Sequence, residues 1–178
     1  MSLRLFNELP AAEAERALTA CCSAPRWARV VAARRPFASV EELQAAAADA
    51  LRDSDLDDAL RGHPRIGDRV AGGASAREQS GVAAASAEVR DALALGNRAY
   101  EARFGHVYLV CASGRSAEDL LATLQARLTN DPATERKVAL GELTGINGLR
   151  LARMVGAPLQ ETPIDGALLD DPPVEGAT

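Results

Sequence analysis

The sequence has few aromatic residues and few histidines. Aromatic side chains make up 3% of the 178 residues, and the chain contains two histidines, three cysteines and one tryptophan. Hydrophobic residues nevertheless reach 47%, so the core must consist mainly of Ala, Leu and Val, a composition that favours packed helices. The length is sufficient for one domain with a substantial core.

Disulfide and membrane patterns are also missing. Cys21, Cys22 and Cys111 are odd in number and two of them are adjacent, which gives no disulfide framework and favours a reducing, cytoplasmic compartment. No apolar run is long enough to cross a membrane, and the first residues lack the apolar region of a secretory signal. A net charge of -5 argues against nucleic acid or an anionic membrane as the main partner.

The common cofactor motifs do not occur. The chain has no GxGxxG, no phosphate-binding P-loop, no HExxH and no zinc-type spacing of its cysteines. Its one lysine, Lys137, lies in the charged stretch TERKVAL, whereas Schiff-base chemistry needs a desolvated lysine. We therefore expect a site built from His, Glu, Ser, Gln and Arg, with no cofactor and no metal.

Hydrophobic periodicity predicts an all-α protein, a single-domain bundle of about eight helices. Residues 1–156 form the expected helical domain, and the proline-rich, acidic residues 157–178 form the expected tail. The segments read as helical are residues 11–22, 25–34, 39–51, 54–62, 75–104, 116–128 and 132–156.

Helix starts are indicated by capping residues. The expected N-caps are Ser39, Ser54, Ser75, Ser116 and Asp131, with Glu78 completing a capping box behind Ser75. Residues 106–112, HVYLVCA, are strand-like, but they are too short and solitary to build a sheet. We interpret this run as the buried start of the next element.

The stretch RGHPRIGDR holds His63 in an unusual local sequence. Pro64 disfavours helical geometry at His63, and Gly67 permits a tight turn after it. Imidazole suits general acid–base catalysis near pH 7, so His63 is a candidate catalytic group, although residue physics alone leaves a structural role equally open. His106 follows a helix end beside apolar residues, which favours a structural role for it.

Two further stretches carry polar groups that could serve a site. In SAREQ, residues 75–79, Ser75 and Glu78 could simply start a helix, or they could join Gln79 and exposed backbone N–H groups in holding a small polar molecule. In GINGLRLARM, Arg150 and Arg153 lie on the last helix. Arginines on such a helix most often face solvent, and an inward orientation is the alternative.

Five ordered pieces of this chain carry a resemblance to a known family. HPRIG, SAREQSG, NRAYEARFG, LQARLTND…E and LRL resemble the 2-oxo-4-hydroxy-4-carboxy-5-ureidoimidazoline (OHCU) decarboxylases of urate catabolism. The likeness runs from about residue 3 to residue 155 and includes LRLFNELP, CCSAPRWA and RRPFAS. It implies an all-helical, cofactor-free and usually homodimeric enzyme that forms (S)-allantoin stereospecifically from a small-molecule substrate.

The resemblance also assigns roles to residues. It implies that His63 is the catalytic histidine and Glu78 the site carboxylate. The substrate contacts that it implies are Pro64, Ser75, Gln79, Arg150 and the segment His106-Val107-Tyr108.

That last segment departs from the family pattern, which places an aromatic, a proline and an aromatic after FG. His106-Val107-Tyr108 lacks the proline, which alters the expected shape of that pocket wall and makes His106 a possible pocket residue. Two other functions stay open: a lyase acting on another small ureido acid, and a helical interaction module without catalysis.

Overall fold

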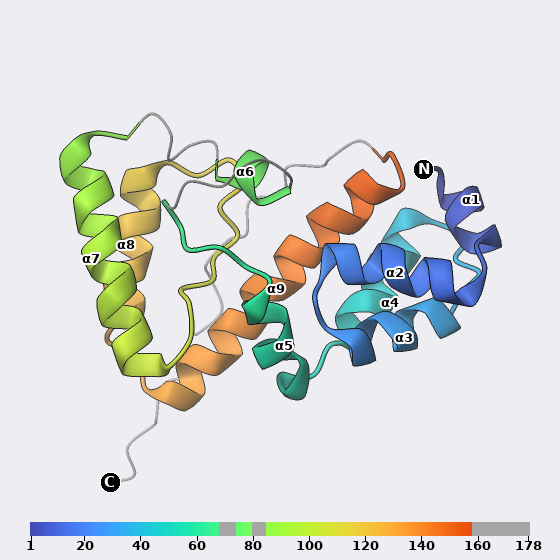
Figure 1. Cartoon of the computed structure of the whole chain (residues 1–178), viewed down its shortest axis with the longest axis horizontal. Helices are drawn as coiled ribbons and strands as arrows, with labels where there is room; N and C mark the ends of the chain where they lie inside the picture. The colour runs from blue at the N-terminus through green and yellow to red at the C-terminus, as the bar shows by residue number, and fades with distance from the viewer. Residues whose placement is uncertain (68–73, 80–84, 158–178) are drawn as a thin grey trace, which may run out of the picture.

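The computed structural model describes residues 1–67, 74–79 and 85–157, and these residues form helices joined by short connections (Figure 1). No strand occurs within these ranges, which confirms the all-α prediction. The expected tail lies outside the described residues except for Ala157. The helices are α1 (Leu3–Glu8), α2 (Ala11–Cys21), α3 (Pro25–Ala33), α4 (Val40–Ala50), the 3₁₀ helix η1 (Asp53–Asp55), α5 (Leu56–Arg61), α6 (Ala74–Glu78), α7 (Ala87–Phe104), α8 (Ala117–Arg127) and α9 (Pro132–Met154).

Three of the expected N-caps form as the sequence indicates. The Ser39 and Ser116 hydroxyls each accept a hydrogen bond from the backbone N–H three residues further on, at 3.2 and 3.1 Å. The Asp131 carboxylate accepts from the N–H groups two and three residues further on, ahead of a proline in the first turn of α9. These caps satisfy amides that a helix start otherwise leaves unpaired.

The prediction of a helical stretch from residue 75 to 104 was wrong in its extent. Helix α6 ends at Glu78, and α7 starts anew at Ala87 behind the N-cap Ser86, whose hydroxyl accepts from the N–H of Val89. Ser75 is not the N-cap either, because α6 already includes Ala74. The side chains of Ser75 and Glu78 bond to α9 instead of closing a capping box.

Ser54 was also wrongly expected to begin a helix. It lies inside η1, and α5 follows from Leu56. The nearby Asp55 is 2% exposed and explains this geometry. Its carboxylate accepts from the Arg26 side chain and from the Arg52 backbone N–H, so the chain turns tightly to satisfy a buried charge.

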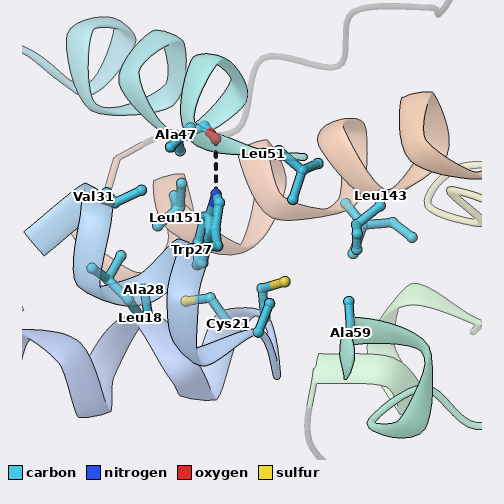
Figure 2. Close-up of a cluster of buried hydrophobic side chains, with 14 of the residues drawn as sticks. Leu18, Cys21, Trp27, Ala28, Val31, Ala47, Leu51, Ala59, Leu143 and Leu151 are labelled. Carbon is cyan, nitrogen blue, oxygen red and sulfur yellow. Dashed lines mark hydrogen bonds between the residues drawn. The ribbon is translucent and has the colours of Figure 1, made fainter. Parts of the chain in front are cut away.

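The apolar side chains gather in two clusters on either side of α9. The first cluster joins α2, α3 and α4 to α9 around Trp27, whose indole N–H donates to the Ala47 carbonyl at 2.8 Å (Figure 2). The second cluster joins α7 to α8, which lie side by side in Figure 1, and contains Tyr100, Leu120 and Leu124. A Cβ added at Gly96 would lie 2.6 Å from a terminal methyl group of Leu124, so a larger residue there would force the Leu124 side chain to move.

Residues 107–112 connect the two clusters. Tyr108 to Ala112 are buried as expected and Val107 is half-buried, but the run does not start the next element, because α8 begins only at Ala117. Leu109 and Cys111 pack into the first cluster, whereas Tyr108, Val110 and Ala112 pack into the second. This alternation is the pattern of an extended chain with an apolar neighbour on each face, and it excludes a helical conformation for the run.

Two broad features accompany this fold. All three cysteines are free and buried. In the described part of the chain, no helix is both long and apolar enough to cross a bilayer, and no three His, Cys, Asp or Glu side chains gather as metal ligands would.

Candidate functional site

The end of α5 fixes the ring of His63. The chain leaves the helix at Gly62, the His63 N–H bonds to the Leu60 carbonyl, and Pro64 follows. The ring Nδ1 lies 2.8 Å from the Ala59 carbonyl oxygen. A carbonyl only accepts hydrogen bonds, so Nδ1 carries the proton and Nε2 is left with a lone pair. Nε2 is buried and has no hydrogen-bond partner among the described residues.

The surroundings of His63 favour its neutral form. Burial lowers the pKa of His63 below its ordinary value of 6.5, and the positive charge of Arg150 acts in the same direction. The Ala59 carbonyl and the negative charge of Glu78 oppose this shift without overcoming it. At pH 7 the ring is therefore neutral, with an unprotonated Nε2 able to take a proton.

Glu78 is held by a bidentate ion pair across the molecule. Arg150 donates from Nε to Oε1 and from Nη2 to Oε2 of Glu78, both at 2.8 Å. Both side chains are buried, at 7% exposure for Glu78 and 8% for Arg150. Arg153 adds a third contact at 3.4 Å. Two guanidinium groups thus compensate the carboxylate and fix the direction in which its oxygens point.

Most of the donors on Arg150 are engaged by protein groups. Besides the two bonds to Glu78, Nη1 donates to the Cys21 carbonyl at 2.9 Å and Nη2 reaches the Ser75 hydroxyl at 3.3 Å. Four of the five N–H groups of Arg150 therefore have acceptors in α2 and α6. Arg150 faces inward, and the structure shows it orienting Glu78.

The loop after Pro64 is attached to α6 through Gln79. The Gln79 side-chain oxygen accepts from the Gly67 N–H at 3.0 Å. Gly67 adopts φ +90°, a conformation that favours glycine. One residue earlier, the Ile66 carbonyl accepts from the side-chain amide of Asn97. The histidine loop is thereby joined to α6 and α7.

Six of the nine residues expected at the site line one cavity of about 20 Å³, about the volume of one water. They are His63, Pro64, Ser75, Glu78, Gln79 and Tyr108. The cavity thus joins a neutral imidazole, a compensated carboxylate, an amide and a hydroxyl. Arg150 lies behind Glu78 and lines a second cavity of about 220 Å³, together with Arg153 and Cys21.

His106 and Val107 do not line the first cavity. The His106 ring meets Tyr100 edge-on with centroids 5.5 Å apart, and Val107 packs against the first apolar cluster. The wall begins at Tyr108 and continues through Leu109, Val110 and Ala112. Sequence reasoning missed the last three of these residues, together with Ile66 and Ile146, although the strand-like apolar run HVYLVCA was the available signal.

Cys21 also lies close to the site. Its thiol lines the larger cavity, 3.7 Å from the Met154 sulfur. Burial raises the pKa of Cys21 to about 11. The thiol is therefore protonated at neutral pH and is not a ready nucleophile.

Fold and site together define a class of protein: an all-helical protein with a buried polar cavity equipped for acid–base chemistry by histidine and a fixed carboxylate. Residues 7–152 match the model of the OHCU decarboxylase family. That match covers well over half of the chain, and the chain belongs to this family.

Individual relatives agree with this assignment. The chain is 36% identical to a human putative 2-oxo-4-hydroxy-4-carboxy-5-ureidoimidazoline decarboxylase, over 75% of this chain and 83% of the human one. It is 32% identical to the decarboxylase of the same name from Amia calva, over 78% of this chain and 85% of the relative. It is 30% identical to the Arabidopsis thaliana uric acid degradation bifunctional protein TTL, of which it spans only 45%.

Two solved structures share the fold. A crystal structure of an OHCU decarboxylase in the presence of (S)-allantoin superposes with a TM-score of 0.69 at 27% identity, over 78% of this chain and 96% of that one. A crystal structure of (S)-allantoin synthase superposes with a TM-score of 0.67 over 87% of this chain and 54% of that one. Its identity is 17%, so it supports the fold alone.

Proposed function

We propose that this chain catalyses the decarboxylation of OHCU to (S)-allantoin in urate degradation, as a carboxy-lyase without a cofactor. The observation that carries the proposal is that one buried cavity contains both the unpartnered Nε2 of His63 and the carboxylate of Glu78. Support also comes from membership of the OHCU decarboxylase family and from the names of the relatives.

The reaction suits a site of this composition. The carboxylate of OHCU is on a hydroxyl-bearing carbon next to a C=N bond. When the carbon–carbon bond to the carboxylate breaks, its electron pair moves into this conjugated system as CO2 leaves. The hydroxyl then loses its proton and becomes a carbonyl, while both atoms of the former C=N bond gain a proton, the carbon on one face. One proton is thus released and two are taken up, and the additional proton comes from solvent. The enzyme has to provide a base, an acid and a fixed orientation.

His63 is the base in this scheme. The hydroxyl proton of the substrate passes to Nε2, which is unprotonated because Nδ1 donates to Ala59 and the ring is neutral. Acid–base help of this kind contributes about 10²- to 10⁴-fold in rate. Stabilisation of the hydroxyl as it becomes a carbonyl is thereby assigned to the imidazole.

Glu78 is the acceptor for the ureido or ring N–H groups of the substrate and relays a proton to the product. Ser75, Gln79 and Pro64 contribute polar and shape contacts to the same cavity. Arg150 serves as a positioning residue for Glu78, and the family resemblance implies for it a substrate contact, for which one N–H group remains. His106 and Val107 lie behind the part of the cavity wall that begins at Tyr108, and any effect they have on the substrate is exerted through that wall.

The organisation of the protein completes the proposal. We assign catalysis to a domain of residues 1–156 and treat residues 157–178 as a dispensable tail. The enzyme works as a homodimer in the cytoplasm, a location that three free, buried cysteines favour. The dimer rests on the family resemblance and is checked by light scattering of the purified protein.

The test generates OHCU in situ from urate by oxidation and hydrolysis and follows circular dichroism at the allantoin wavelength, with and without this chain. The proposal predicts fast growth of an (S)-allantoin signal with the enzyme and a slow, racemic background without it. Full activity after exhaustive chelation is also expected. Turnover of another ureido acid from a panel, but not of OHCU, would assign the site to a different lyase.

A further inference from the structure

The sequence stretch LQARLTND…E folds into a buried charged cluster outside the cavity. Arg127 donates from Nε to Glu135 Oε1 at 2.8 Å, and the Asn130 amide donates to Glu135 Oε2 at 2.7 Å. Arg127 is 5% exposed and Glu135 is fully buried. Buried ion pairs contribute little to net stability, so the cluster calls for a role beyond holding α8 against α9.

Arg127 and Glu142 also hold the wall of the cavity. The Arg127 guanidinium donates to the Leu109 carbonyl at 2.7 Å and lies over the Tyr108 ring at 4.9 Å. Glu142 of α9 accepts from the Cys111 N–H at 2.8 Å. Arg127 and Glu142 lie 3.7 Å apart, so both act from the same side of the segment. One charged pair therefore fixes both peptide groups that flank Val110.

This arrangement determines where the backbone of Val110 points. In a trans peptide the C=O and N–H point in opposite directions, and the peptides on either side of Val110 are trans. With the Leu109 C=O and the Cys111 N–H directed at Arg127 and Glu142, both the N–H and the C=O of Val110 point away from that pair. Val110 lines the cavity and is 3% exposed. Neither of its backbone groups has a hydrogen-bond partner among the described residues.

We propose that Arg127 and Glu142 are positioning residues that hold the Val110 peptide groups, one donor and one acceptor, toward an amide or ureido edge of the substrate. An amide edge presents a C=O and an N–H side by side, the complement of what Val110 offers. Buried backbone groups left without partners are rare and costly, and a ligand of this chemistry would satisfy them. This inference rests on the proposed function.

Glu142 offers a sharper test than Arg127, because its side chain is 18% exposed and removing Arg127 would leave the buried Glu135 carboxylate without a charged partner. Glu142→Ala removes the acceptor for the Cys111 N–H. Glu142→Gln keeps a side-chain oxygen there and serves as the rescue variant. Arg127→Lys keeps a positive charge beside Glu135. A lysine ammonium group lacks the planar guanidinium, so it cannot donate to Glu135 and to the Leu109 carbonyl in the same geometry. The control is Arg136→Ala, which removes two other ion pairs, to Asp53 and Asp57, from the same helix.

We expect Glu142→Ala to raise KM for OHCU by about tenfold with kcat within a few-fold, the scale of one or two lost hydrogen bonds. Binding of (S)-allantoin should weaken by a similar factor. Arg127→Lys should move KM in the same direction. Glu142→Gln and Arg136→Ala should retain the wild-type KM. If Glu142 had only a structural role, Glu142→Ala would reduce the folded fraction, which lowers the apparent kcat and leaves KM unchanged. That result would overturn the inference.

Amide hydrogen exchange across residues 106–112 supplies a readout that does not require turnover. The Cys111 amide should exchange faster in Glu142→Ala than in Glu142→Gln, because the alanine variant has no acceptor for it. Equal protection of the Cys111 amide in the two variants would contradict the hydrogen bond from Cys111 to Glu142. Absence of OHCU turnover by the wild-type chain would contradict the proposed function and, with it, the positioning role. The exchange result would still report whether Glu142 holds the Cys111 amide.

Discussion

Arg150 of α9 donates hydrogen bonds of 2.8 Å to both carboxylate oxygens of Glu78 in α6, a residue 72 positions earlier in the sequence. The side chains of Arg150 and Glu78 are 8% and 9% exposed, so both charges need compensation within the protein. The bond ties a five-residue helix, too short to be stable alone, to the longest helix of the described chain. The same contact thus stabilises α6 and orients a proposed catalytic carboxylate.

We expect the Glu78–Arg150 pair to show strong coupling in stability. Arg150→Met leaves a buried carboxylate with only the contact from Arg153, and should cost about 3–5 kcal/mol in the free energy of unfolding. Glu78→Gln should cost a comparable amount, since its amide N–H₂ would face a guanidinium donor. The double variant should lose clearly less than the sum of the two single losses. Urea denaturation of all four proteins measures this, and additive losses would mean that the pair is not coupled.

His63→Ala should lower kcat by about 100-fold or more, the scale of general acid–base catalysis. His63→Asn should recover little, because an amide can hydrogen-bond but cannot exchange the proton. The melting temperature should change little in either variant, since the ring contributes one bond to Ala59 and little apolar burial. Lys137→Ala, at a residue to which the scheme assigns no role, is the matched control. Near-normal turnover in His63→Ala would exclude His63 from the mechanism.

The pH dependence should carry the signature of His63. Its folded pKa is lowered below 6.5 by burial, so the acidic limb of kcat/KM should lie below pH 6.5, where the ring takes up a proton. The unfolded chain binds that proton at higher pH than the folded chain. The contribution of His63 to the free energy of unfolding is therefore present above about pH 6.5 and is lost as the pH falls through the folded pKa. Rate profiles and urea titrations between pH 5 and 8 measure both effects, and an acidic limb above pH 6.5 would contradict the assignment.

Local sequence signals account for the helix starts and for the rigid histidine. Ser39, Ser116 and Asp131 cap their helices through hydrogen bonds that span two or three residues. The local sequence is therefore sufficient to predict these caps. The break after Glu78 was missed although Ser86 offers a cap of the same kind. A continuous amphipathic pattern concealed it.

The assembly of the site depends on contacts that no local pattern encodes. Glu78 meets Arg150 because the fold brings α6 against α9, whereas the sequence alone favoured a solvent-facing Arg150 and left an inward orientation as the alternative. Its inward place followed only from the family resemblance. The cavity wall was expected two residues too early, at His106, because the family resemblance placed the segment His106-Val107-Tyr108 at the substrate. The two faces of the extended segment from Tyr108 to Ala112 have neighbours only once both apolar clusters exist.

Trp27→Phe should destabilise the protein without altering the chemistry of the site. Trp27 is fully buried, and its indole N–H is the partner of the Ala47 carbonyl (Figure 2). Phenylalanine leaves that carbonyl without its donor and opens a small cavity, for a combined cost of about 2–4 kcal/mol. Turnover per folded molecule at 25 °C should match the wild type, because Trp27 does not line the cavity. A raised KM in the folded variant would show that the first apolar cluster controls the geometry of the site.

A chain ending at Ala157 should turn over OHCU within a few-fold of the full-length rate. The last described contact of the site comes from Arg153, and the Ala157 N–H closes the end of α9 by bonding to the Ala152 carbonyl at 2.9 Å. The removed segment is rich in proline and acidic residues, a composition with little apolar surface to bury. The melting temperature should therefore stay close to that of the full chain. Kinetics and thermal unfolding of the two chains are measured side by side. A large loss of turnover at an unchanged melting temperature would mean that residues 158–178 reach the cavity and belong to the active site.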